Sequence, residues 1–264
     1  MNINQTNRKE DARKERVLLP TLKVLLEKRF PDAEIKFTDS KTEQLQGSDF
    51  LIKSYKLFND NEFHTVDAKA ATDYIVVDGK GDGLPTFAME LASMQNSKLR
   101  EGWAINNEEF YKNTEYFCFQ WIFTKENTND LSIKNISRID VKIIPKKKLI
   151  AFINNPYDFF PNMDKEGYIG NLERERIDGL YHWMENTYNK LEGKPDGNYI
   201  CDKLNVELKK GRLFLSLMNR HEVGGKGPKI VYTSKKIKGE SPLNLTIAKD
   251  PYLSKLSIFS EILK

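Results

Sequence analysis

The first half of the chain begins with a pattern of leucines at helical spacing. Between Glu10 and Phe30, apolar residues recur three and four positions apart, at Leu18, Leu22, Leu25 and Leu26. This spacing predicts an amphipathic helix. Pro20 interrupts the pattern and is expected either to kink the helix or to start a second helical piece. Residues 30–32 (Phe-Pro-Asp) are a turn signal that predicts the end of the helix.

Short apolar runs after this helix predict strands. The run Tyr116–Phe123 is apolar on both faces and therefore predicts a central strand. In the run at 86–91, alternation puts Phe87, Met89 and Leu91 on one face. Other strand candidates lie at 33–38, 50–52, 103–105, 137–144, 206–208, 212–217 and 230–232, and residues 171–191 favour a helix.

This order of helices and strands predicts an α/β (α+β) fold with a central mixed sheet flanked by helices. We expect residues 1–125 to form the core of the protein. Residues 126–264 are expected to form a C-terminal α+β extension, which either binds nucleic acid or completes the same domain.

Composition narrows the class of protein further. The chain has 264 residues, 39% hydrophobic and 30% charged, so it is long enough to bury a full core. No stretch reaches the ~18 apolar residues of a membrane span, so no membrane partner is expected. Cys118 and Cys201 are the only cysteines, and two distant cysteines form neither a disulfide framework nor a zinc site. We therefore expect a reducing, cytoplasmic location.

Candidate chemistry is concentrated between Gly47 and Thr72. Asp49 begins one apolar run, and Asp67-Ala68-Lys69 ends the next, with turn-forming residues at 59–61 between them. Asp67 and Lys69 share one strand face because side chains alternate. Pairing the two runs as a hairpin would place Asp49 near Asp67 at one end of the sheet. Aspartate oxygens suit a hard cation such as magnesium, and a neighbouring lysine can orient a water, so the pattern predicts metal-assisted hydrolysis of a phosphodiester.

These residues resemble the PD-(D/E)XK nuclease superfamily, which has the restriction-endonuclease-like fold. The matching residues are Asp49 and the triplet at 67–69, and the resemblance covers roughly residues 9 to 124. It implies a restriction-endonuclease-like core in which Asp49 and Asp67 bind Mg²⁺, with Mn²⁺ as a substitute. It also implies that the carbonyl of Ala68 adds a ligand and that Lys69 assists the attacking water. One departure is that Ser48, rather than proline, precedes Asp49.

Many members of that superfamily carry one more acid in the first helix. The resemblance implies that Glu15 fills this role, with Glu10 and Glu27 as substitutes. The competing interpretation of the whole pattern is an exposed hairpin with ordinary surface charges.

Basic residues indicate where a phosphate backbone would lie. Residues 201–264 contain 13 Lys and Arg against 6 Asp and Glu, although the net charge of the chain is only +4. A solvated lysine-rich surface is the alternative explanation. The expected nucleic-acid-binding residues are Lys146, Lys147, Lys148, Lys209, Lys210, Arg212, Lys226 and Lys229.

The sequence thus predicts a magnesium-dependent endonuclease acting on DNA, in a restriction, defence or mobile-element context, with RNA left open as a substrate. Paired cleavage of a duplex would favour a homodimer. The alternative is a non-catalytic nucleic-acid- or protein-binding module that retains a nuclease-like fold. In that case Asp49 and Asp67 would lie too far apart to share an ion.

Overall fold

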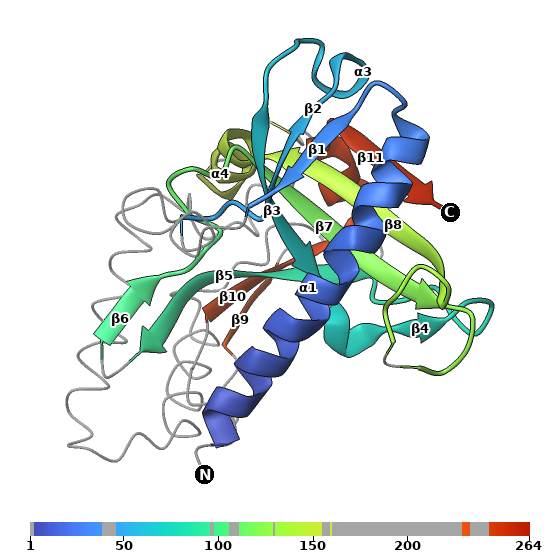
Figure 1. Cartoon of the computed structure of the whole chain (residues 1–264). Coiled ribbons are helices and arrows are strands. Elements are labelled where there is room, and N and C mark those ends of the chain that lie inside the picture. Colours follow the sequence, from blue (N-terminus) through green and yellow to red (C-terminus); the bar gives the residue numbers. More distant parts are fainter. Residues whose placement is uncertain are drawn as a thin grey trace. The chain divides into compact units, whose positions relative to one another are not determined.

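The computed structural model (Figure 1) describes residues 3–38, 46–95, 98–105, 111–128, 130–154, 159, 229–232 and 243–264. The chain divides into two compact units. The first unit includes the described residues between 6 and 87, 111 and 148, and 249 and 264. The second includes described residues within 88–105, 149–159 and 229–248. The candidate site lies wholly in the first unit.

The first unit is built on a mixed sheet with seven strands among the described residues, in the order β1-β2-β3-β7-β8-β11, with β4 paired to β7. Strands β3 and β7 are parallel, as are β4 and β7, and the other neighbours are antiparallel. The predicted α/β class with a central mixed sheet is therefore confirmed. The strands are β1 (Glu34–Phe37), β2 (Phe50–Lys53), β3 (His64–Ala70), β4 (Val76–Val77), β7 (Tyr116–Thr124), β8 (Ile136–Pro145) and β11 (Phe259–Leu263).

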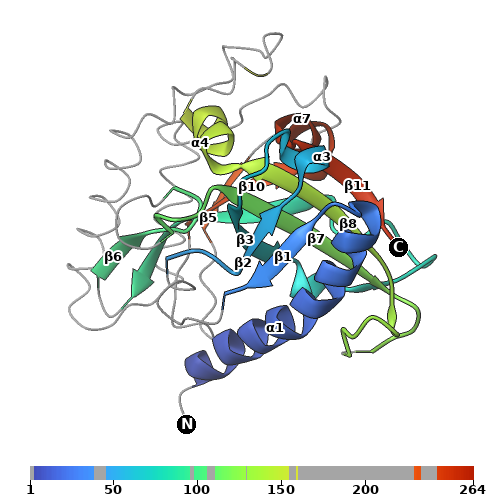
Figure 2. The ribbon, with the colours of Figure 1, turned by 45° about the horizontal axis from the view of Figure 1, so that its top comes forward.

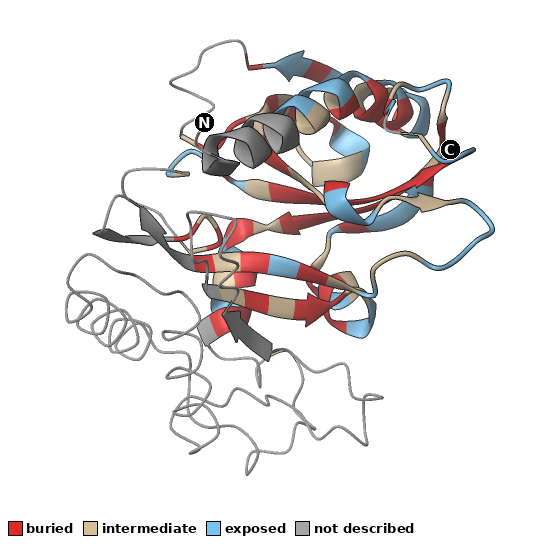
Figure 3. Ribbon diagram, turned by 90° about the horizontal axis from the view of Figure 1, so that it is seen from below, coloured by how far each residue is buried: buried red, intermediate tan, exposed pale blue. Residues whose placement is uncertain are grey.

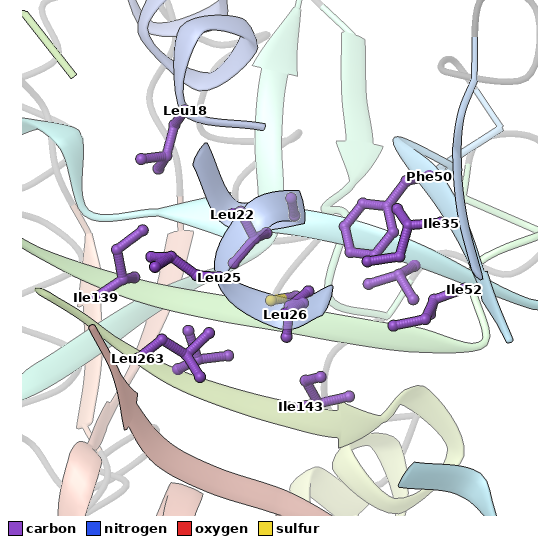
Figure 4. Close-up of a cluster of buried hydrophobic side chains, with 14 of the residues drawn as sticks. Leu18, Leu22, Leu25, Leu26, Ile35, Phe50, Ile52, Ile139, Ile143 and Leu263 are labelled. Atoms are coloured by element: carbon purple, nitrogen blue, oxygen red, sulfur yellow. The ribbon is translucent and has the colours of Figure 1, made fainter. Parts of the chain in front are cut away.

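Helix α1 (Ile3–Arg29) lies across one face of this sheet (Figures 1 and 2). It continues through Pro20, and the predicted leucines form its buried stripe. Leu22, Leu25 and Leu26 project toward Ile139 and Ile143 of β8 (Figure 4). Figure 3 shows buried positions on this helix and along the strands, with exposed positions on the outer side of the helix. Apolar area removed from water at this interface is the main force that fixes the helix on the sheet.

The two faces of the sheet carry different residues. Val66 and Ala68 of β3 belong to the core under α1, so alternation directs Asp67 and Lys69 to the opposite face. Strand β7 is buried on both faces, as predicted for a central strand. Four of its aromatic residues share the face of Asp67 and Lys69, and these are Phe117, Phe119, Trp121 and Phe123, whereas Tyr116 packs against the core under α1.

The second unit contains a separate sheet of four described strands, in the order β6-β5-β10-β9. Phe87, Met89 and Leu91 are buried, as the alternation at 86–91 predicted. The strands are β5 (Thr86–Gln95), β6 (Lys98–Glu101), β9 (Lys229–Tyr232) and β10 (Leu243–Ala248), and helix α4 (Lys146–Asn154) follows β8.

The structure differs from the sequence-based expectation at 103–105, which is a turn rather than a strand. Gly102 and Ala104 donate backbone hydrogen bonds to the carbonyls of Leu91 and Glu90, at 2.8 and 3.1 Å. The chain therefore folds back on β5 after β6, and the apolar Trp-Ala-Ile run does not extend along a neighbouring strand. The predicted helix at 171–191 and the predicted strands at 206–208 and 212–217 lie outside the described residues.

The main sheet continues past residue 125, where the sequence suggested that the core ends. β8 pairs with β7, and the C-terminal strand β11 pairs with β8. Part of the second half of the chain thus completes the sheet that carries the candidate site. No helix in the described ranges is both long enough and apolar enough to span a membrane.

Candidate metal-dependent hydrolytic site

The antiparallel pair β2 and β3 brings Asp49 beside Asp67, as the sequence predicted. Phe50 lies opposite Val66 in the register of the two strands. The connection between them is longer than a tight hairpin, because it contains the short helix α3 (Tyr55–Phe58) and a left-handed residue at Asn59. This connection joins β2 and β3 at the end of the pair opposite to Asp49.

Asp49 is fixed by its backbone and by its side chain. Its N–H donates to the carbonyl of Val66 at 3.0 Å, and its carbonyl accepts the N–H of Thr38 at 3.0 Å. Asp49 and Phe50 both face Val66, an arrangement typical of a β-bulge, which changes the direction of a side chain. The Oδ2 atom of Asp49 accepts the N–H of Ala68 at 2.7 Å. The carboxylate of Asp49 thus accepts the N–H that a backbone carbonyl of β2 would accept in a regular strand pair. This hydrogen bond holds Asp49 against β3.

Asp67 is a buried carboxyl group, with only 2% of the residue exposed. Its register partner on β7 is Phe117. The neighbouring aromatic ring provides no hydrogen-bonding group to replace the water that burial removes from the carboxyl group of Asp67. Its Oδ1 atom is 2.8 Å from Nζ of Lys69. Its Oδ2 atom is buried and has no hydrogen-bond partner among the described residues. An orphaned carboxylate oxygen is expensive unless a proton or a cation compensates it.

The proton is the compensation available to the protein alone. Burial raises the pKa of Asp67 to about 8; Lys69 opposes this shift, and the charge of Asp49 adds to it. A hydrogen bond between the carboxyl groups of Asp49 and Asp67 exists only when one of them carries a proton. The raised pKa keeps that proton on Asp67 near neutral pH, and a cation shared by the two groups would displace it.

Lys69 is the basic member of the cluster. Burial alone would lower the pKa of Lys69, but Asp67 and further groups, including Glu15 and Asp49, raise it above the ordinary value. Lys69 therefore stays protonated and acts as a hydrogen-bond donor rather than a base. The half-buried Glu15 of α1 is close enough for its charge to act on Lys69. Glu27 instead lies 3.6 Å from Lys23, and the side chain of Glu10 is outside the description.

The carbonyl of Ala68 faces the same edge of β3 as Asp49. In a strand, the N–H and C=O of one residue point to the same neighbour. Since the N–H of Ala68 meets Asp49, its carbonyl also points toward the position beyond the start of β2. No cluster of three or more His, Cys, Asp and Glu side chains suited to a metal occurs among the described residues. Two carboxylates and a carbonyl still fit magnesium, which commonly uses one or two carboxylates and keeps several waters.

The expected nucleic-acid-binding lysines are only partly described. Lys146 is buried, with 3% exposed, and its Nζ donates to the carbonyl of Tyr111 at 2.7 Å, so it does not present its charge to a phosphate backbone. Lys147 is exposed, and Lys148 donates to the carbonyl of Lys255 at 3.0 Å. Four of the expected residues lie outside the described residues: Lys209, Lys210, Arg212 and Lys226. For Lys229 the structure describes the backbone but not the side chain.

A loop at 111–115 packs against the site, and the sequence analysis missed it. Thr114 donates from its hydroxyl to the carbonyl of Gly47 at 2.6 Å, two residues before Asp49. Nζ of Lys69 lies 5.2 Å from the ring centroid of Tyr111. The loop is a polar stretch with no periodicity, so its sequence contained no signal for this contact.

Gly47 allows this loop to approach. Its φ is +81°, and an added Cβ would lie 2.7 Å from Cα of Tyr111. We expect Gly47→Ala to lower the unfolding free energy by about 2 to 3 kcal/mol, because steric overlap adds to the left-handed strain. Gly79→Ala is the matched control, since Gly79 has φ +80° but nothing within 4 Å of an added Cβ. Urea denaturation should give a loss of only about 1 kcal/mol for the control. Equal losses for both variants would contradict the close packing at Gly47.

A second group of charged residues, of which Asp140 and Lys142 are buried, lies on β8. Arg138, Asp140 and Lys142 alternate with apolar residues, and they share a face with the aromatic side chains of β7. Asp140 pairs with Lys249. Lys142 donates to three side chains of the C-terminal segment: Ser254 Oγ at 2.5 Å, Ser260 Oγ at 2.6 Å and Asp250 Oδ1 at 3.4 Å. The three donors of this ammonium are thus used to attach the C-terminal segment to the sheet.

Cys118 has a structural position and is excluded as a nucleophile. It is fully buried in the core under α1, and burial raises the pKa of its thiol above the ordinary value.

Comparison with protein-family models, curated proteins and solved structures gave no match.

Proposed function

We propose that this protein is a metal-dependent nuclease of the PD-(D/E)XK type that hydrolyses phosphodiester bonds in DNA. The observation that carries the proposal is the buried Oδ2 atom of Asp67, which has no hydrogen-bond partner among the described residues. It lies beside a second carboxylate, Asp49, and a protonated lysine, Lys69. A cation shared by the two carboxyl groups could take the place of the proton that the raised pKa keeps on Asp67.

Asp49 and Asp67, with the carbonyl of Ala68, are the residues that would hold Mg²⁺ or Mn²⁺. A bound ion of this kind would supply a water of lowered pKa and neutralise charge on the phosphate. Asp49 is held for this task by the N–H of Ala68, so its carboxylate needs little reorganisation. Lys69, whose Nζ lies 2.8 Å from Oδ1 of Asp67, would orient the attacking water or stabilise charge on the phosphate oxygens. Glu15 acts on the same lysine through its charge.

The test is incubation with supercoiled plasmid, single-stranded DNA and RNA, each with Mg²⁺, Mn²⁺ or a chelator. We expect plasmid cleavage with either metal and none with chelator. Asp49→Asn and Asp67→Asn should each lower the cleavage rate at least about 100-fold. Asp32→Asn is the control, because Asp32 is exposed and bonded to the N–H of Lys56, away from the site.

Two results would contradict the proposal. Metal-dependent cleavage that survives both substitutions would move the chemistry elsewhere. Binding of nucleic acid without cleavage of any substrate would favour the alternative, a non-catalytic module. Cleavage of RNA but not of DNA would support the proposed site and contradict DNA as the substrate.

A further inference from the structure

Tyr111 has a backbone conformation that residues other than glycine rarely adopt. Its φ is +62°, in the left-handed region, where Cβ crowds the backbone. Apart from Asn59, it is the only non-glycine residue with positive φ among the described residues. Such residues persist where surrounding contacts determine the conformation, and they are frequent at functional sites.

The contacts that hold Tyr111 come from two sides. Nζ of Lys146 donates to the carbonyl of Tyr111 at 2.7 Å, and Thr114 donates its N–H to the same carbonyl at 3.1 Å. Lys146 is itself fixed, because its own N–H donates to the carbonyl of Glu115 at 2.8 Å. On the other side, the backbone of Gly47 lies so close that no Cβ would fit. The buried ammonium of Lys146 thus fixes the position of this loop carbonyl.

The ring of Tyr111 faces the ammonium group of Lys69. The distance from Nζ of Lys69 to the ring centroid is 5.2 Å, within the range of a cation–π contact. The same Nζ lies 2.8 Å from Oδ1 of Asp67. The ammonium of Lys69 is therefore held between a carboxylate and an aromatic ring, and these two contacts limit its rotamers.

We infer that Tyr111, held by Lys146, is a positioning residue that directs the ammonium of Lys69 into the site. Lys146 acts through Tyr111 and touches neither substrate nor metal. The role in catalysis rests on the proposed function, whereas the restraint on Lys69 is a property of the protein alone. The two parts are measured separately.

The restraint is tested by acylation of lysines with an amine-reactive ester, followed by mass spectrometry, without nucleic acid or metal. We expect Lys69 to react at least about tenfold faster in Lys146→Met and in Tyr111→Leu than in the wild-type protein. Tyr111→Phe keeps the ring and should leave the rate near that of wild type. The control is Lys112→Met, which removes an exposed lysine next to Tyr111. Equal Lys69 reactivity in all variants would overturn the inference.

Cleavage kinetics test the catalytic part. Tyr111→Leu and Lys146→Met should lower kcat by about 10- to 100-fold with little change in KM, since small errors in placing a catalytic group affect kcat. Tyr111→Phe should restore most of the rate, and Lys112→Met should match wild type. If Lys146→Met does not fold, Tyr111→Leu still tests the ring with Lys146 in place. A change in Lys69 reactivity without any wild-type cleavage would refute the proposed function but keep the positioning role.

Discussion

Replacing Lys69 with alanine is expected to abolish cleavage while leaving the binding of metal and DNA in place. Lys69 stays protonated, because Asp67 and other charged groups raise its pKa against the effect of burial. Its loss removes a preorganised donor aimed at developing charge, and one such donor is worth about 100- to 1,000-fold in kcat. Asp49 and Asp67 remain, so the oxygens that would hold the cation are still present.

Single-turnover cleavage of plasmid with Mg²⁺ measures the chemical step, and Mn²⁺ titration measures metal binding. Lys53→Ala is the matched control, since Lys53 is a half-buried lysine on the neighbouring strand β2 and has no role in the proposed chemistry. Unchanged cleavage by Lys69→Ala would remove this residue from the mechanism. Loss of metal binding together with cleavage would instead indicate that Lys69 maintains the shape of the site.

The parts of the fold that could be predicted from sequence are those with strong local periodicity. The leucine stripe of α1, the apolar strand β7 and the alternation in β3 each depend on residues close together in the chain. β10 and β11 were missed, although β10 alternates and its partner β9 is near in sequence. The partner of β11, the strand β8, is distant in sequence, and the pattern of β11 is short. β11, for example, is buried only at Phe259 and Leu263, its two ends.

The residues of the candidate site also fall into those that local sequence patterns predict and those that they do not. Alternation along β3 was sufficient to place Asp67 and Lys69 on one face, and the apolar run before the turn placed Asp49 near them. Tyr111 and the role of Lys146 could not be predicted, because both depend on a loop that folds back from the start of β7. The row of charges on β8 left a signal that could have been used, since Arg138, Asp140 and Lys142 alternate with apolar residues.

The pH dependence of stability should reveal the proton on Asp67. In chelator, we expect the unfolding free energy of the wild-type protein to fall as pH rises from about 4 to about 8 relative to that of Asp67→Asn. The unfolded chain loses the proton of this carboxyl near pH 3.8, whereas the folded protein keeps it up to about pH 8. Between these values the folded state binds more protons, so stability decreases with pH, by at most ~1.4 kcal/mol per pH unit.

Urea denaturation of both proteins at intervals of half a pH unit measures this difference. The unfolding free energy of Asp67→Asn minus that of the wild-type protein should increase between about pH 4 and about pH 8 and become constant above about pH 8. The total increase should be about 3 to 5 kcal/mol. Asp32→Asn provides a control of opposite sign. The N–H of Lys56 lowers the pKa of Asp32, so the stability that its carboxylate contributes is lost as pH falls.

Adding Mg²⁺ should reverse the trend in the wild-type protein. A cation that binds the ionised carboxyl displaces the proton, so its stabilisation grows as pH rises, and binding near pH 7 should release protons. Calorimetric titration in two buffers of different ionisation enthalpy counts those protons, and Asp67→Asn should release none from this position. Parallel stability profiles for wild type and Asp67→Asn would mean that Asp67 is already ionised in the folded protein. The buried Oδ2 atom would then need a different partner, and the case for a cation at this site would lose its main support.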